Sequence, residues 1–302
     1  MKGAPRPAEP IAARILWPLC LSLIFSLASL PVRAYDGSAH QFMTFLAAKQ
    51  FNRCVEGTDI PALTPLQVRY IAKANTGLAD RSVFARMFNW RYYDRNDQSE
   101  QSMMWVVDTR FHDHFDELSG RLQVVEDPVA AYQDLGRAIS YIQLVSSPPR
   151  VVPVYVARFW RFSFSDRFDS YPLDEEALVS EIEGDCGFLE PAPESYADVL
   201  IAVAERTMEA VFEPMSGLPT DWTAFWRPDP NADGFGDYGP AGNAFGRRTE
   251  FRCAGGERCV LLNDDPLYAE FAIARHADAI RGTQAAMLLM QLSMRDIIAS
   301  AQ

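Results

Sequence analysis

Residues 127–149 read DPVAAYQDLGRAISYIQLVSSPP, and this stretch predicts a long buried helix. Asp127 followed by Pro128 is typical of a helix start, because Asp caps free backbone N–H groups and Pro fits the first helical position. Pro148-Pro149 marks the end, since proline cannot continue a helix. Between these signals, apolar residues recur every three or four positions, at Val129, Tyr132, Leu135, Ile139, Ile142 and Val145. This spacing predicts a continuous buried stripe along one helix face.

Helical spacing extends over most of the remaining chain. Further helices are predicted from Ser38 onward, from Pro65 to Gly77, from Asp174 to Glu183, from Ser195 to Phe212 and from Pro266 to about Ala299. The stretch 214–263 is rich in Gly and Pro and is predicted to be irregular. No internal repeat and no linker composition divides the chain. We therefore expect a single all-α domain with a long C-terminal core helix and a small disulfide-closed hairpin.

Composition indicates an ordinary globular protein with an acidic charge balance. Of 302 residues, 48% are hydrophobic and 23% are charged. The chain has 28 Lys and Arg against 40 Asp and Glu, which gives a formal net charge of -12. Because duplex nucleic-acid binding depends on neutralising phosphates, this balance argues against a duplex nucleic acid as partner.

The first 34 residues are expected to be a signal peptide rather than part of the fold. Lys2, Arg6 and Arg14 precede an apolar run over 15–30, and small residues follow at the positions that a signal peptidase reads. The run contains a proline and is shorter than the about 20 residues of a membrane span, so a permanent anchor is the second interpretation. We expect residues 1–34 to be removed and residues 35–302 to be exported to the periplasm or the medium.

Cysteine usage agrees with export. Loss of Cys20 with the signal leaves Cys54, Cys186, Cys253 and Cys259, an even number in an oxidising compartment. Cys253 and Cys259 flank a Gly-rich reversal and can close a small hairpin, which leaves Cys54 to bridge Cys186. The other two pairings stay open at this point. A zinc site built from these thiols is not expected, because no Cys-x-x-Cys spacing occurs.

Five blocks of the sequence occur in a characteristic order. They are Tyr35-Asp-Gly-Ser-Ala-His40, Leu78-Ala-Asp80, Asn89-Trp-Arg91-Tyr-Tyr-Asp94, Ser140-Tyr-Ile-Gln-Leu144 through Pro148-Pro-Arg150, and Ser165-Asp-Arg-Phe-Asp169. In order and spacing, over most of residues 35–302, these blocks resemble the zinc-dependent phospholipase C and fungal single-strand nuclease superfamily. A C-terminal run from Ala274 is also similar to that family.

The resemblance implies a helical domain that holds three zinc ions in a cleft, where a metal-bound water attacks a phosphate ester. Carried over residue by residue, four positions remain compatible with metal binding. They are Tyr35, whose amine and carbonyl would bind zinc after cleavage, together with His40, Asp80 and Asp169.

The other family ligand positions are substituted. A His falls on Arg91, the His, Asp and His of the central helix fall on Ser140, Leu144 and Arg150, and a last His falls on Ser165. Arginine stays protonated in proteins and cannot ligate a metal. Arg91 and Arg150 could instead replace the lost cations and pair with Asp80 and Asp169. The favoured interpretation is that they form structural ion pairs only, and the alternative is that they also hold a phosphate group bidentately.

Two functions follow from this pattern. In the first, the chain is a catalytically silent or anion-binding homologue with a degraded metal site, and its ligand is a phosphate-containing small molecule or a phospholipid. In the alternative, it is an active phosphoester hydrolase of phospholipase C or nuclease type with a reduced or rearranged zinc site.

The segment 229–240 resembles a calcium-binding loop. Oxygen-bearing side chains stand at Asp229, Asn231, Asp233 and Asp237, and the sixth position is Gly234. This alternation brings oxygens onto one ion while Gly permits the sharp turn. The usual Glu at the twelfth position is missing, so either a weak calcium site or an acidic surface turn is predicted.

The remaining histidines carry weaker signals. His112 and His114 could form a substitute metal site with Asp116, although an exposed polar segment that starts the next helix is favoured. His276 stands in the C-terminal helix beside Arg275 and Asp278, where a solvated or hydrogen-bonded role is expected.

Overall fold

The structure is a computed structural model of the 302-residue chain. It describes residues 37–79, 91–93, 110–154, 166–230 and 235–300, all of which belong to the unit Ala34–Gln302. The predicted signal peptide lies outside these residues. None of the helices in the described ranges is long and apolar enough to cross a membrane.

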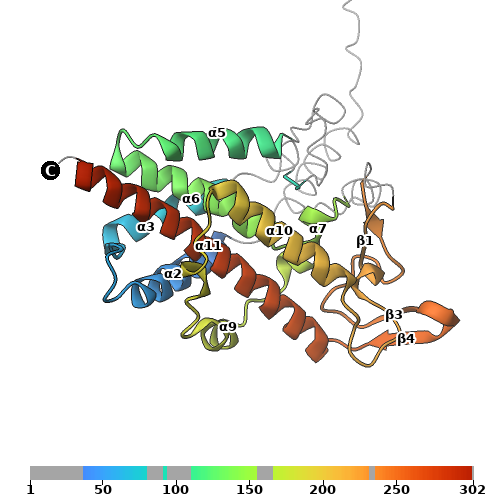
Figure 1. The fold of residues 1–302 in the computed structure, drawn as a ribbon. Coiled ribbons are helices and arrows are strands. Elements are labelled where there is room, and N and C mark those ends of the chain that lie inside the picture. The colour runs from blue at the N-terminus through green and yellow to red at the C-terminus, as the bar shows by residue number, and fades with distance from the viewer. Residues whose placement is uncertain (1–36, 80–90, 94–109, 155–165, 231–234, 301–302) are drawn as a thin grey trace, which may run out of the picture. The chain divides into compact units, whose positions relative to one another are not determined.

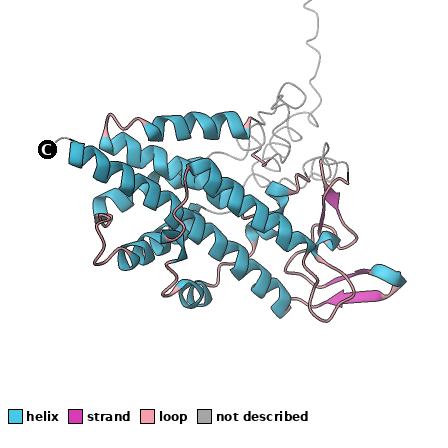
Figure 2. Cartoon of the chain, viewed as in Figure 1, coloured by secondary structure: helices cyan, strands magenta, loops and turns pink. Residues whose placement is uncertain are grey.

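The described part is mostly helical, as predicted, with two small two-stranded sheets (Figures 1 and 2). The α-helices are α2 (Gly37–Cys54), α3 (Pro65–Ala79), α5 (Phe111–Gln123), α6 (Pro128–Leu144), α7 (Pro148–Val151), α9 (Glu175–Ile182), α10 (Tyr196–Phe212) and α11 (Pro266–Ser300). Short 3-10 helices are η1 (Phe168–Ser170), η2 (Gly187–Leu189), η3 (Trp222–Ala224) and η4 (Ala254–Gly256). The strands are β1 (Trp226–Arg227), β2 (Asp237–Tyr238), β3 (Thr249–Arg252) and β4 (Arg258–Leu261).

Helix α6 is the hub of the packing, because it contacts α3, α5, α10 and α11. It starts where the sequence predicts, with the Asp127 side chain accepting a hydrogen bond of 2.9 Å from the Val129 amide. Gly136 lets α3 approach closely, since a Cβ at this position would lie 2.2 Å from the Ile71 carbonyl oxygen. The predicted stripe is buried except at its start, where Val129 is 40% exposed.

The long helix α11 packs against α2, α6, α9 and α10 (Figure 1). Gly282 fits it against α6 and α10, because a Cβ there would lie 2.8 Å from Ile142 and 2.7 Å from Val203. Phe45 of α2 and Leu66 of α3 are apolar, yet they are 43% and 56% exposed. Burial therefore follows the contacts with α6 and α11 rather than apolarity alone.

The strands fall in the segment between α10 and α11 (Figure 2). The predicted hairpin is formed by antiparallel β3 and β4. The ribbon of β1 and β2 was not predicted, and it is held by the buried Asp166 carboxylate. This carboxylate accepts hydrogen bonds from Trp226 Nε1 at 3.1 Å and from the Tyr238 hydroxyl at 2.9 Å.

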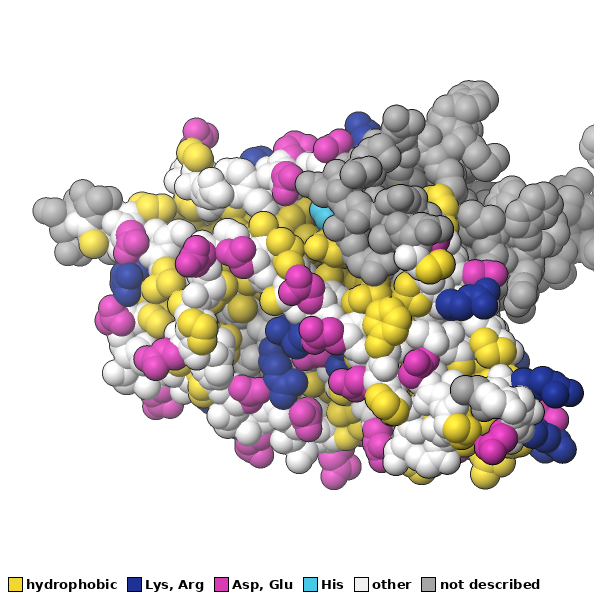
Figure 3. Space-filling view, turned by 45° about the vertical axis from the view of Figure 1, so that its right-hand side comes forward, with side chains coloured by type: hydrophobic (Ala, Val, Ile, Leu, Met, Phe, Trp, Pro, Cys, Tyr) yellow, Lys and Arg dark blue, Asp and Glu magenta, His cyan; other side chains and the backbone are white. Residues whose placement is uncertain are grey.

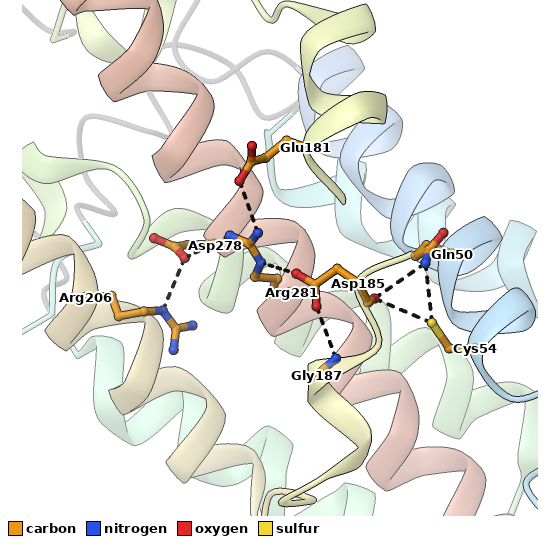
Figure 4. A network of polar contacts seen from close by, with 8 residues as sticks. All are labelled: Gln50, Cys54, Glu181, Asp185, Gly187, Arg206, Asp278 and Arg281. Atoms are coloured by element: carbon orange, nitrogen blue, oxygen red, sulfur yellow. Dashed lines mark hydrogen bonds and ion pairs between the residues drawn. The ribbon is translucent and has the colours of Figure 1, made fainter. Parts of the chain in front are cut away.

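Both disulfides have the pairing favoured by the sequence. Cys253 bonds Cys259 across the hairpin, and Cys54 at the end of α2 bonds Cys186. The Cys186 segment is also tied to α11, because Arg281 Nε donates to Asp185 Oδ2 at 2.7 Å (Figure 4). In the same network Arg206 of α10 pairs with Asp278 of α11 at 3.3 Å. These contacts join three helices and one loop.

The two disulfides should differ in their contribution to stability. The Cys54–Cys186 bridge spans a sequence separation of 132 residues, whereas the Cys253–Cys259 bridge spans 6. In the chain-entropy description, closing the longer loop is worth about 5 kcal/mol and the shorter about 2 kcal/mol. We therefore expect the Cys54→Ser, Cys186→Ser double variant to lose clearly more free energy of unfolding in urea than the Cys253→Ser, Cys259→Ser variant. Equal losses would contradict this assignment.

Candidate functional site

His40 of α2 is buried, with 2% of its surface exposed. Its Nδ1 lies 2.6 Å from the side-chain oxygen of Gln143. Because an amide oxygen only accepts, Nδ1 carries the hydrogen and Nε2 carries the lone pair. Burial, helped by Arg91 and Arg150, lowers the pKa of His40 to about 4 against the opposing effects of Gln143 and Asp169. His40 is thus a neutral imidazole near two arginines and one carboxylate.

A buried polar network around Gln143 fixes His40. The Gln143 oxygen also accepts from Asn75 Nδ2 at 2.9 Å, and Gln143 Nε2 donates to Thr283 Oγ1 at 3.1 Å and to Thr44 Oγ1 at 3.2 Å. These residues come from α2, α3, α6 and α11. The network therefore couples the orientation of one histidine to the packing of four helices.

Asp169 carries the most completely buried charge near His40. Its side chain is fully buried in η1, where Oδ2 lies 3.0 Å from Arg150 Nη2. Its other oxygen accepts from the Ser147 hydroxyl at 2.5 Å. The Arg150 side chain is 13% exposed. Arg150 and Asp169 thus form a nearly buried ion pair supported by a hydroxyl.

Arg91 lies beside this ion pair. Arg150 Nη1 donates to the Arg91 carbonyl oxygen at 3.2 Å, and the Tyr93 amide donates to the Arg150 carbonyl oxygen at 2.7 Å. The Arg91 guanidinium sits over the Tyr141 ring of α6, 4.6 Å from its centroid. A stacked guanidinium keeps its planar donors oriented.

His276 of α11 is buried rather than solvated. It is 2% exposed, and its ring centroid lies 5.7 Å from that of Phe168. Burial lowers the pKa of His276 to about 3, with smaller contributions from His40 and Arg275. Of the two roles expected from the sequence, this burial excludes the solvated one, and the hydrogen-bonded one stays a prediction. Both buried histidines are neutral at pH 7.

The structure brings together part of the predicted set. His40, Arg91, Arg150 and Asp169 interact electrostatically at one place. Ser140 is buried and shares a face of α6 with Gly136 and Gln143 by its three- and four-residue spacing, and Leu144 is 8% exposed. Tyr35, Asp80 and Ser165 lie outside the described residues.

The described residues at these positions do not fit a zinc site. Within the described ranges, no group of three or more His, Cys, Asp or Glu side chains could hold a metal ion. His40 and Asp169 are suitable ligand types, but catalytic zinc takes about three protein ligands. Arg91 and Arg150 cannot ligate, and their positive charges would oppose a divalent cation near His40.

The predicted calcium loop is only partly described, since Asn231 and Asp233 lie outside the described residues. Asp237 falls in β2, where its Oδ2 lies 3.8 Å from Arg227 Nη2. The calcium site stays a prediction. His112 and His114 lie within α5, where a separation of two residues directs them to different sides of the helix.

Sequence reasoning missed the residues that hold the site. Gln143, Asn75, Thr283 and Ser147 are all fully buried and polar. Gln143 and Ser147 lay inside the block that carried the resemblance, yet neither occupies a family ligand position. A detectable signal was present, because a glutamine within an apolar helix needs hydrogen-bond partners if it is buried.

Comparisons of the chain with protein-family models, with curated proteins and with solved structures found no match.

Asp169→Asn should destabilise the fold strongly. Removal of the buried carboxylate charge leaves Arg150 largely buried without its counter-ion, which typically costs about 3–5 kcal/mol. Glu183→Gln is the matched control, because it breaks the exposed Arg53–Glu183 pair, whose side chains are 52% and 67% exposed, and should cost less than about 1 kcal/mol. Urea unfolding measures both. A loss for Asp169→Asn no larger than that of the control would show that the pair is not structural.

Acid should destabilise the protein through His40 and His276. Below the unfolded pKa of 6.5 the unfolded histidines bind protons, whereas the folded ones stay neutral until pH approaches about 4 and about 3. The stability contributed by these histidines is therefore complete above pH 6.5 and is lost as pH falls, by about 1.4 kcal/mol per pH unit for each.

The measurement is the free energy of unfolding at several pH values between pH 6.5 and about pH 3. His276→Gln should flatten this dependence, because glutamine does not titrate. His114→Gln, which removes a partly exposed histidine of α5, is the control and should retain the dependence on the buried pair. A wild-type stability that stays level down to pH 4 would contradict the assignment.

Proposed function

We propose that the chain is an exported, divergent member of the zinc-dependent phospholipase C and nuclease superfamily whose cleft binds a phosphate-like anion without hydrolysing it. The observation that carries this proposal is the Arg150–Asp169 ion pair, with Arg91 beside it, at three of the positions that the resemblance assigns to metal ligands. In this proposal, the guanidinium groups of Arg91 and Arg150 take the place of the family's metal cations. They keep positive charge in the cleft, but they cannot ligate a metal ion.

The chemistry of this arrangement suits a phosphate group. Among the described charged neighbours of His40, two are cationic and one is anionic. A guanidinium has five N–H donors in a planar fork, more than a single carboxylate accepts, and it can bind phosphate oxygens in a bidentate manner. The neighbouring His40 is neutral, so it does not add a third positive charge at pH 7.

Absence of hydrolysis in this proposal follows from the residues themselves. Phosphoester hydrolysis in the superfamily needs clustered metal ions to activate water, and the described positions supply only His40 and Asp169 as ligand types. The alternative of an active hydrolase would need Tyr35 and Asp80 to complete a reduced zinc site. Export is supported by the apolar N-terminal run and by the two disulfides, which persist in oxidising compartments.

The anion proposal is tested by titrating the full chain with inorganic phosphate in a calorimeter. We expect saturable binding that weakens as salt rises, since the recognition is electrostatic. Arg91→Gln should reduce the affinity by about tenfold, because it removes one charge-assisted donor group. Arg252→Gln, at an exposed position of β3, is the matched control and should have no effect.

Arg150→Gln gives a second variant with the expected loss of both phosphate binding and stability, since it also leaves Asp169 without its cation. Phosphate binding that persists in Arg91→Gln at the wild-type affinity would overturn the anion site.

Metal content separates the two functions. Elemental mass spectrometry on exported, processed protein should find no stoichiometric zinc after dialysis against a weak chelator. Two or three zinc ions per chain, with turnover of phospholipid or nucleic-acid diesters, would support the hydrolase instead.

A five-residue variant tests the family mapping directly. Arg91→His, Ser140→His, Leu144→Asp, Arg150→His and Ser165→His together should restore zinc uptake. A folded variant that takes up no zinc would show that the mapping of family ligands onto these five positions is wrong. The result for phosphate binding by the wild type would not depend on it.

A further inference from the structure

A cleft of about 370 Å³ opens between the segment that follows η1 and the start of α11, and its described lining does not include Arg91 or Arg150. This volume lies within the range of small-molecule sites, about 300–1,000 Å³. Its wall contains Tyr171, Leu173, Asp174 and Asp264, and His276 lies among the lining residues from α11. Neither the resemblance nor the anion proposal assigns a role to this cleft.

The hollow exists because α11 presents small side chains here. Ala269, Ala272, Ile273 and His276 recur at spacings of three, one and three residues, so they share one face of the helix. Two alanines on this face leave the space that larger side chains would fill. With Leu173 and Pro172 they make an apolar floor.

The charged side chains in this cleft are all acidic. Asp174, Glu175 and Asp264 line it, and the described lining includes no Lys or Arg. Burial raises the pKa of the Tyr171 hydroxyl, and Asp264 and Asp174 raise it further, which indicates that both carboxylates act on this ring. His276 is neutral at pH 7 and brings no positive charge to the floor.

Acidic side chains are common on the face of the molecule shown in Figure 3, so carboxylates alone do not mark a site. The distinguishing feature is their combination with an apolar floor and an aromatic wall that is held in place. The Tyr171 ring packs edge-on against Phe245, with centroids 5.1 Å apart, and a Cβ at Gly246 would lie 2.8 Å from it. Asp174 is fixed as the cap of α9 by a 2.9 Å hydrogen bond from the Ala177 amide.

We propose that this cleft binds an organic cation, an ammonium group carried on a short apolar chain. The ammonium group lies at Asp174, Asp264 and the face of Tyr171, where carboxylates and the ring both favour positive charge. The apolar chain lies on the floor formed by Ala269, Ala272 and Ile273. An anionic ligand of the same shape is rejected by like-charge repulsion.

The probe is n-hexyltrimethylammonium, titrated calorimetrically into the full chain with both disulfides formed, with hexane-1-sulfonate as the probe of opposite charge. We expect saturable binding of the cation in the low-millimolar range or tighter and no binding of the sulfonate. Asp264→Asn should weaken binding by about fivefold, the upper effect of a solvent-exposed charge pair. Asn suits this position, because Asp264 has a φ of 54°, which Asn also tolerates.

Two further variants make the test specific to the cleft. Ala269→Leu, at a partly exposed position in α11, fills the floor without removing charge and should abolish binding of the cation. Asp113→Asn, an exposed acidic residue of α5, is the matched charge control and should bind as the wild type does.

No binding of the cation, equal binding of the sulfonate, or unchanged binding in Ala269→Leu would each overturn the proposal. Phosphate binding at Arg91 and Arg150 is measured in a separate titration. A negative result for the organic cation therefore does not contradict the anion proposal, and a negative result for phosphate does not contradict the cation proposal.

Discussion

The side-chain amide of Gln143 imposes the constraint on which the rest of the structure depends. It is fully buried on α6, where a polar group without partners costs about 1–3 kcal/mol. Its partners His40, Thr44, Asn75 and Thr283 come from α2, α3 and α11. A slip of any of these helices by one turn would remove at least one of these buried hydrogen bonds. Apolar packing therefore sets which helices meet, and the bonds of Gln143 favour one register between them.

The same amide determines the chemistry of His40. By accepting from Nδ1, it leaves the Nε2 lone pair on the other side of the ring, which a metal ligand also requires. The groups that act electrostatically on His40 are nevertheless Arg91, Arg150 and Asp169. A buried carboxylate is stable next to either a metal ion or a guanidinium, because both neutralise its charge. Arg150 therefore meets the charge requirement of the buried Asp169 carboxylate without a metal ion.

The helices were predictable because their signals are local. The Asp127 cap, the Ser195 cap and the Pro266 start all fall where the sequence indicated. The β1 and β2 ribbon was not, since two-residue strands have no periodicity and depend on Asp166, which lies 60 residues from Trp226 in sequence. Exposure of Phe45 and Leu66 also escaped prediction, because apolar spacing shows which residues share a face but not whether another helix covers it.

The sequence predicted that arginines would pair with Asp80 and Asp169, and the structure has the Arg150–Asp169 pair; the sequence did not predict the electrostatic position of His276. His276 lines the acidic cleft and interacts electrostatically with His40. His40 in turn interacts electrostatically with Arg91 and Arg150. The two buried histidines therefore connect the acidic cleft with the arginines. Burial keeps both imidazoles neutral at pH 7. A positive charge on His276 would weaken the proposed binding of a cation in the acidic cleft. A positive charge on His40 would be attracted to Asp169. Burial therefore adds no positive charge to the acidic cleft that His276 lines or to the neighbourhood of Arg91 and Arg150. This property depends on burial, and no residue pattern reveals it.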